Sequence, residues 1–292
     1  NLLYLVLCGI LGLAILYLLG EKVFMQGVIA GLEGSRGTGK RKRLGANQEA
    51  GNLFVTLVSI ERKLFLRDPN FALNGLVGYV LLPVMALLPL FGQNLEKNPF
   101  ATLNLGEINS LLIIGGIALF FMIMTSFSMI PSTTFSREGR YLWIIRSLPL
   151  SISQIIGARV VAAQVVNTIG CLLGLVPIAY FFGWGVLEGV FGTVFGILLA
   201  SVVAFLLALL DLSRPMLDWV NPVKAVKSNL NAIIGTFGSL ALGFLLGLLF
   251  FFNRQTGTLW LIPLELGFVT ALFAGLARLL VTRVAPRLWT KI

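Results

Sequence analysis

The sequence predicts an all-α polytopic membrane protein with seven transmembrane helices, one interfacial amphipathic helix and one short cytoplasmic helix. Hydrophobic residues make up 57% of the 292 residues and charged residues only 12%, whereas a soluble domain carries about 25% charged residues. Seven apolar stretches each have roughly the 17–25 residues that a helix needs to cross about 30 Å of hydrocarbon. These stretches are residues 2–19, 71–91, 108–130, 159–182, 187–210, 232–252 and 259–282.

The distribution of basic residues predicts the orientation. When the seven stretches cross the membrane alternately, only Lys97 and Arg254 fall on one side, which leaves 20 of the 22 Lys and Arg residues on the other (22 − 2 = 20). Short loops rich in Lys and Arg stay in the cytoplasm. We therefore expect a multi-pass protein of the bacterial plasma (inner) membrane, with residue 1 outside and the C-terminus inside. The predicted cytoplasmic parts are residues 20–70, 131–158, 211–231 and 283–292.

Several function classes are not expected from the composition. The formal charge of +10 follows from the positive-inside bias and the anionic inner leaflet, and no basic cluster alternates with stacking aromatic residues, so we predict no nucleic-acid binding. Histidine is absent, which removes the usual general base and the commonest metal ligand. Cys8 and Cys171 lie in apolar stretches without polar neighbours in sequence. We predict neither catalysis nor a cofactor or metal.

A glycine-rich, basic linker over residues 20–48 separates the first span from the other six. Within it, Gly34-Ser-Arg-Gly-Thr-Gly-Lys40 fits the first seven positions of a phosphate-binding loop. The eighth position is Arg41, where a hydroxyl must ligate magnesium, and no strand precedes the segment. We therefore expect no ATP site in this chain.

Residues 52–69 open the group of six spans with an amphipathic pattern. Leu53, Leu57, Ile60 and Leu64 recur at spacings of three and four, which is typical of a helix lying at the membrane surface. Glu61, Arg62, Lys63 and Arg67 supply the charges toward its C-terminal half, and Pro69 is expected to end it. The alternative is an ordinary juxtamembrane helix without a partner.

The loop at residues 131–158 has the richest chemistry of the predicted cytoplasmic parts. Ser136 is expected to cap a short helix that ends before Pro149, and Ser151 with Gln154 forms a capping box for the next helix. Tyr, Trp and Arg are enriched at binding hot spots. An interfacial aromatic belt with snorkelling arginines is the alternative. The candidate binding residues are Arg137, Glu138, Arg140, Tyr141, Trp143 and Arg146.

Polar residues inside the spans are candidates for a substrate path. Gln164, Asn167 and Thr168 form one stripe on a helix, and Glu265 lies about 9 Å inside the last span. Such residues usually face the protein interior or a water-filled cavity. Hydrogen bonding between helices is the commoner reason for such a stripe, and the alternative for Glu265 is a structural acid that pairs with another helix or snorkels to the outer surface.

Residues 52–282 resemble the permease of an ATP-binding cassette (ABC) transporter of the type-2 exporter class. The resemblance rests on the helix ending Arg67-Asp68-Pro69, on Ser136-Arg-Glu-Gly139 and on Leu148-Pro-Leu-Ser151 between the second and third spans of a six-span unit. It implies that the loop helix is a coupling helix, which contacts a separate ATPase subunit. The segment 221–231, which begins Asn-Pro-Val-Lys, resembles one in long bacterial permeases that carry two such units.

The resemblance implies a unit at residues 49–292, preceded by the linker and by an isolated helix at residues 1–19. That helix would be the last of a preceding unit, so we expect a longer polypeptide. The expected partners are the ATPase, the lipid bilayer and a second permease half. An ion- or proton-coupled secondary transporter and a non-transporting membrane scaffold remain alternatives.

Overall fold

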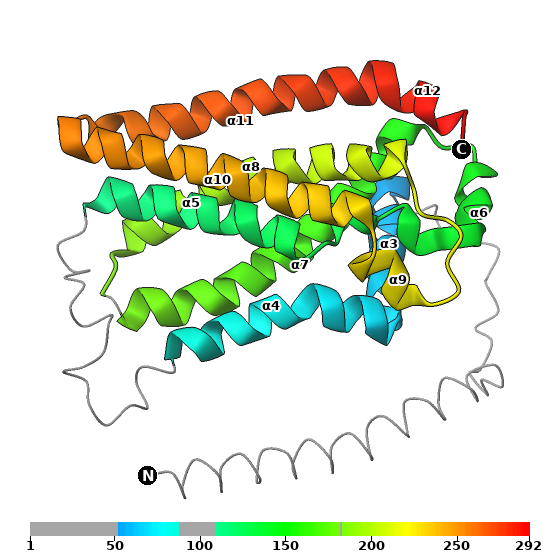
Figure 1. Cartoon of the computed structure of the whole chain (residues 1–292), viewed down its shortest axis with the longest axis horizontal. Helices are drawn as coiled ribbons and strands as arrows, with labels where there is room; N and C mark the ends of the chain where they lie inside the picture. The colour runs from blue at the N-terminus through cyan, green and yellow to red at the C-terminus, as the bar shows by residue number, and fades with distance from the viewer. Residues whose placement is uncertain (1–51, 88–108, 182) are drawn as a thin grey trace, which may run out of the picture. The chain divides into compact units, whose positions relative to one another are not determined.

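The computed structural model describes residues 52–87, 109–181 and 183–292, and every regular element in these ranges is helical (Figure 1). The predicted span 2–19 and the linker 20–48 lie outside the described residues, as do residues 88–108. The long helices are α4 (Pro69–Leu87), α5 (Ser110–Phe127), α7 (Ile152–Phe181), α8 (Val186–Ser213), α10 (Leu230–Thr256) and α11 (Ile262–Leu279). The short elements are α3 (Leu53–Arg67), η6 (Pro131–Thr133), η7 (Ser136–Tyr141), α6 (Leu142–Arg146), α9 (Pro222–Lys227), η8 (Leu259–Leu261), η9 (Leu280–Val284) and α12 (Ala285–Trp289).

Five helical stretches in the described ranges are long and apolar enough to cross a membrane. They are Ser110–Arg146, Ile152–Tyr180, Val186–Ser213, Val223–Thr256 and Leu259–Trp289, and each contains most of one predicted span. Helix α4 covers most of the predicted span 71–91, whose last residues are not described. The chain therefore has the helical, apolar architecture of a membrane protein, and the count of seven spans stays a prediction.

Small residues let α5 and α8 approach closely. A Cβ atom on Gly192 would lie 2.7 Å from the Ile117 Cβ, and one on Gly196 would lie 2.9 Å from the Phe121 Cβ. Ala200 and Ala204 continue the same buried face of α8. In a bilayer such close packing replaces the hydrophobic driving force that helices have in water.

Helices α10 and α11 have a largely exposed apolar surface. Phe244, Phe252, Leu264 and Phe268 are all at least 60% exposed. In water such a surface would be an aggregation liability, so its extent here is what a lipid-facing surface requires.

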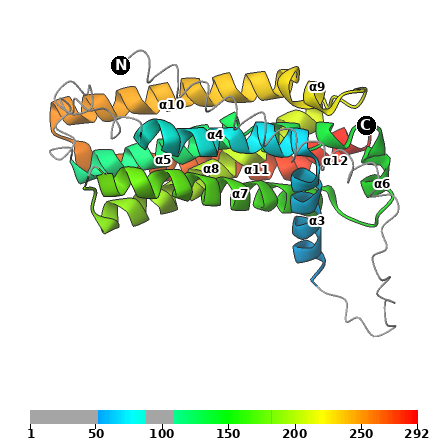
Figure 2. The same ribbon diagram turned by 90° about the horizontal axis from the view of Figure 1, so that it is seen from below.

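Helix α3 runs across the direction of the long helices (Figure 2). Asn52 caps its start by accepting a hydrogen bond from the Phe54 amide, and the helix ends at Arg67, directly before Asp68-Pro69, as predicted. The face that packs on the protein is Leu57, Glu61 and Phe65. Glu61, one of the charges toward the C-terminal half of the helix, lies on this buried face because its carboxylate pairs with Arg137 inside the protein.

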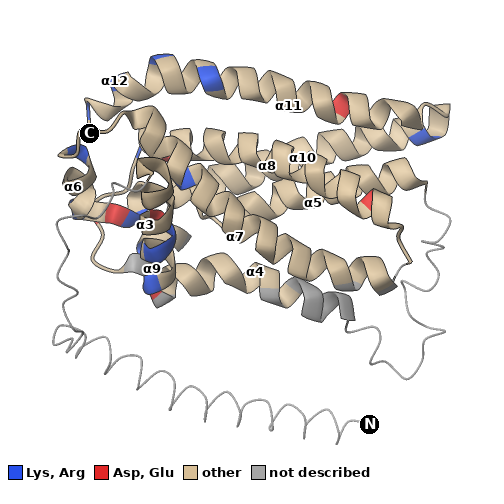
Figure 3. Cartoon of the chain, turned by 180° about the vertical axis from the view of Figure 1, so that it is seen from behind, with Lys and Arg blue, Asp and Glu red and all other residues tan. Residues whose placement is uncertain are grey.

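Most of the charged residues that the structure describes lie toward one end of the long helices, where α3, α6, α9 and α12 are found (Figure 3). We call this the basic end. Two predicted helix starts there are confirmed. Ser151 and Gln154 form the reciprocal capping box before α7, and Asn221 accepts from the Val223 amide at the start of α9.

Candidate docking site at the basic end

The loop between α5 and α7 folds into a compact segment made of η7 and α6, residues Ser136–Arg146, which we call the η7–α6 segment. Ser136 lies inside the first turn of η7, and its hydroxyl donates to Asp211. The predicted N-cap role of Ser136 is therefore wrong. Gly139, with φ at 54°, bends the chain within η7.

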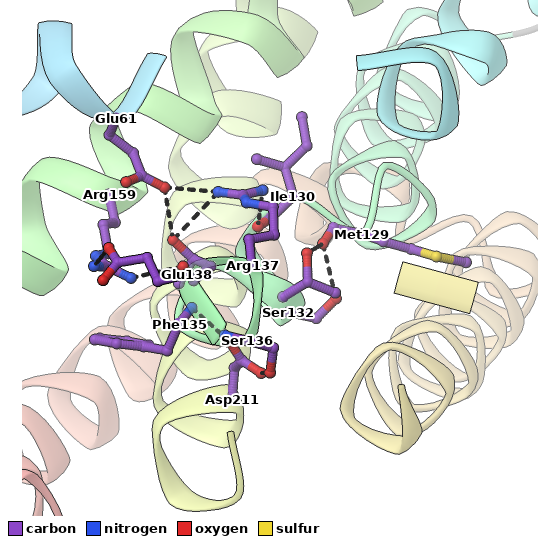
Figure 4. A network of polar contacts seen from close by, with 12 residues as sticks. Glu61, Met129, Ile130, Ser132, Phe135, Ser136, Arg137, Glu138, Arg159 and Asp211 are labelled. Atoms are coloured by element: carbon purple, nitrogen blue, oxygen red, sulfur yellow. Dashed lines mark hydrogen bonds and ion pairs between the residues drawn. The ribbon is translucent and has the colours of Figure 1, made fainter. Parts of the chain in front are cut away.

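Two buried ion pairs attach this segment to its neighbours. Arg137 Nη2 lies 2.6 Å from Glu61 Oε1 on α3, and Arg137 Nη1 donates to the Ile130 carbonyl at 3.0 Å. Glu138 pairs with Arg159 on α7, whose Nη1 donates to the Thr134 carbonyl at 2.6 Å. We call Glu61, Arg137, Glu138 and Arg159 the charged cluster (Figure 4). It contains two acids and two bases, so its formal charge is zero.

The surroundings shift the two carboxyl groups in opposite directions. Burial raises the pKa of Glu138 to about 7, because the opposing effect of Arg159 is smaller and the nearby Glu61 carboxylate adds to the rise. Burial also acts to raise the pKa of Glu61, but Arg159, Arg137 and two hydrogen bonds together lower it. Glu61 is therefore the more strongly ionised acid of the charged cluster.

A third carboxylate, Asp211 at the end of α8, holds the start of the segment. Its Oδ2 accepts the Phe135 and Ser136 amides at 2.7 and 2.9 Å, and its Oδ1 accepts the Ser136 hydroxyl and Asn231 Nδ2. Asp211 is fully buried. Four donors satisfy this carboxylate without a basic side chain, and they join α8 and α10 to the segment.

The loop before α9 covers the other side of the segment. Trp219 Nε1 donates to the Ser136 carbonyl at 2.7 Å, and a Cβ atom on residue 139 would lie 3.0 Å from the Trp219 ring. The Met216 amide donates to the Ser136 hydroxyl at 2.9 Å. Helices α3, α7 and α8 and this loop therefore hold the segment at fixed points.

The six candidate binding residues divide into two groups. Arg137 and Glu138 point inward and are paired within the chain, whereas the other four are exposed at the surface. Tyr141 is 68% and Trp143 65% exposed. Arg146 is exposed and stacks on Trp289 of α12, with 5.6 Å between its Cζ and the ring centre. The outward-facing members are therefore Arg140, Tyr141, Trp143 and Arg146.

A cleft of ≈ 760 Å³ separates α3 from the η7–α6 segment. Ile60 and Leu64 of α3 form one wall, and Tyr141, Ile144 and Leu148 form the other. Glu61, Arg137 and Glu138 also line it. The cleft is mostly apolar, and its polar lining also includes Arg67, Asp68, Asn70 and Thr134.

The structure keeps the predicted stripe of α7 together but places Glu265 apart from it, since Asn167 Nδ2 donates to Gln164 Oε1 at 3.4 Å and Glu265 binds Asn253. Gln164 and Asn167 are buried in the bundle. Gln164 donates to the Ser201 hydroxyl at 3.0 Å, and Asn167 accepts from the Tyr79 hydroxyl at 2.6 Å, so both residues hydrogen-bond to neighbouring helices. Thr168 is half-buried in a shallow groove between α7 and α8.

Glu265 is also held by another helix. Asn253 Nδ2 of α10 donates to both of its carboxylate oxygens at 2.9 Å. No described contact joins Glu265 to Gln164, Asn167 or Thr168. A role for any of these four residues in a substrate path stays a prediction.

Sequence reasoning missed Glu61, Arg159, Asp211 and Asn231 as parts of this site. The sequence offered one signal: Arg159 is a charged residue at the start of the predicted span 159–182, and charged residues in spans usually face the protein interior. No protein-family model, curated protein or solved structure matches the chain.

Proposed function

We propose that this chain is the membrane-spanning permease of an ATP-driven ABC exporter, with a separate ATPase subunit docking on the η7–α6 segment. The proposal includes the seven-span topology, with the basic end in the cytoplasm of a bacterium. The transported substrate is left open.

One observation carries the proposal: a short helix at the basic end exposes aromatic residues while its other side is fixed by buried polar contacts. The side chains of Tyr141 and Trp143 are largely exposed, and large aromatic side chains of this kind anchor protein interfaces. Contacts with Glu61, Arg159 and Asp211 join the same segment to α3, α7 and α8. A force applied to the exposed side would therefore reach three helices directly.

The structure changes which residues should meet the ATPase. Arg137 and Glu138 form ion pairs within the chain, so we assign docking to Arg140, Tyr141 and Trp143. The adjacent cleft would accommodate part of the partner's surface. Docking through an apolar cleft and an aromatic rim fits a protein partner better than a metabolite, because the walls are mostly apolar and open. ATP-driven closure of two ATPases would then bias the spans between two states, to the extent that ATP favours the closed pair.

The test uses two exposed tryptophans at opposite ends of the bundle. Trp143 is 65% exposed on α6, and Trp260 is 62% exposed in η8. The permease is purified with the nucleotide-binding subunit from its own cells, and ATP hydrolysis is measured in proteoliposomes. Y141A/W143A should lose the associated ATPase, whereas W260A should retain it.

Two results would contradict the proposal. One is a permease that purifies without any nucleotide-hydrolysing subunit. The other is equal retention of the ATPase by Y141A/W143A and W260A, which would make the segment an interfacial aromatic belt.

A further inference from the structure

Arg159 has a hydrogen-bond donor that its present partners do not use. Its Nη1 binds the Thr134 carbonyl and its Nη2 binds Glu138, but its buried Nε has no partner. Arg159 is only 3% exposed, so water does not satisfy this group freely. A buried donor without an acceptor is costly, and it indicates a group that serves more than one arrangement.

Glu61 has the complementary unused acceptor. Its Oε1 accepts both from Arg137 Nη2 and from the Thr134 hydroxyl at 3.0 Å, whereas no hydrogen bond to its Oε2 is found among the described residues. Figure 4 shows Glu61, Arg159 and Glu138 next to one another. The charges of Arg159 and Arg137 both act to lower the pKa of Glu61, so the Arg159 charge lies within effective range of both acids.

We propose that Arg159 exchanges partners between Glu138 and Glu61, so that the η7–α6 segment can separate from α7 without leaving a buried cation unpaired. Breaking a buried ion pair is costly chiefly because one charge is left without compensation. Here a second carboxylate stands ready, and Arg159 needs only a side-chain rearrangement to reach it. Arg137 remains on Glu61 throughout, so the segment stays attached to α3.

The exchange gives the segment one fixed attachment and one that can open. Its role in transport rests on the proposed function: movement of the docked ATPase would open the Glu138–Arg159 contact and keep the Glu61–Arg137 contact. Discrete alternative contacts of this kind are what allow a packed interface to switch between two states.

The test is a double-mutant cycle on the isolated permease in detergent, without any ATPase, so it does not depend on the docking proposal. Thermal unfolding is measured for E138Q, E61Q and E61Q/E138Q. In E138Q the Arg159 cation turns to Glu61, and in E61Q it keeps Glu138, so only the double variant leaves it without a carboxylate. The Tm loss in the double variant should exceed the sum of the two single losses.

A matched control combines E138Q with E265Q, whose carboxylate binds Asn253 far from the cluster, and there the losses should add. Because E61Q also deprives Arg137 of its partner, a second background, E61Q/R137Q, removes that pair as a unit. Adding E138Q should lower the Tm more in this background than in the wild type.

Additive losses in both cycles would overturn the exchange. So would failure of the single variant E138Q to fold, because Glu61 would then be unable to replace Glu138.

Discussion

The basic end and the middle of the bundle both bury polar side chains, but they do so with different chemistry. At the basic end, two ion pairs join the η7–α6 segment to its neighbours. The segment supplies the base of one pair, Arg137 with Glu61, and the acid of the other, Glu138 with Arg159. In the middle, Tyr79, Asn167, Gln164 and Ser201 form a chain of neutral hydrogen bonds between α4, α7 and α8.

The difference follows from what each region must do. Neutral amides and hydroxyls join helices without placing a charge in hydrocarbon, where it would be expensive. In the charged cluster each acid has a base beside it, which offsets the cost of burying the two charges. Losing one partner leaves a buried charge there, whereas losing one hydroxyl in the middle leaves only an amide with other partners. The two regions should therefore differ in sensitivity to mutation.

The largest effect is expected for R159A. This change leaves two carboxylates and one base in the charged cluster, and breaking a buried pair costs about 3–5 kcal/mol of unfolding free energy. Proton uptake by Glu138 limits the loss. Denaturant unfolding in micelles measures it, with R140A, an exposed arginine of the same segment, expected within about 0.5 kcal/mol of the wild type. Equal effects of the two variants would mean that the charged cluster does not stabilise the basic end.

An intermediate loss of unfolding free energy is expected for D211A. All the donors to this carboxylate are neutral, so its removal leaves no unpaired charge in the protein. The Phe135 and Ser136 amides lose their acceptor, at about 1–3 kcal/mol for a buried donor left unsatisfied. D218A, in the exposed loop before α9, serves as the control and should leave stability unchanged. A D211A loss as small as that of D218A would show that water replaces the carboxylate.

A smaller effect is expected for Y79F in the middle of the bundle. The variant removes the hydrogen bond from Tyr79 to Asn167 and keeps the ring, and such bonds within membrane proteins average about 0.6 kcal/mol. Y180F is the control, because Tyr180 is 89% exposed. If Y79F were as damaging as R159A, the contrast between the two regions would be wrong.

The last prediction is a pH dependence of stability at the basic end. Because the pKa of Glu138 is raised from 4.5 to about 7, the folded protein binds more protons than the unfolded chain between these values. Its contribution to stability therefore falls as pH rises from about 4.5 to about 7 and then levels off. The lowered pKa of Glu61 acts only below about 4.5. Tm measured across this range should show the slope in the wild type and lose it in E138Q; an unchanged slope in E138Q would assign it to another group.

Sequence patterns predict the parts of this molecule that depend on neighbouring residues. Hydropathy located α5, α7, α8, α10 and α11, and local capping patterns located the starts of α7 and α9. The charged cluster could not be predicted in this way, since Glu61 and Arg137 are separated by 76 positions and Asp211 lies 75 positions from Ser136. The pattern at residues 136–146 showed which residue types were present, but not that Arg137 and Glu138 face inward while Tyr141 and Trp143 face outward.

The bend at Gly139 restricts the number of residues in the η7–α6 segment, just as the buried contacts restrict the residue types on its inner face. The φ angle of Gly139 is positive, and the Trp219 ring packs tightly against the position that a Cβ atom would occupy. An inserted or deleted residue would move the bend, so that Glu138 and Ser136 could no longer both reach their partners. Positions 140 and 143 carry no such constraint. The inner face of the segment is therefore fixed in length and position, whereas its outer surface is free to vary. Selection for a different partner could change that surface one residue at a time while the helices behind it stay unchanged.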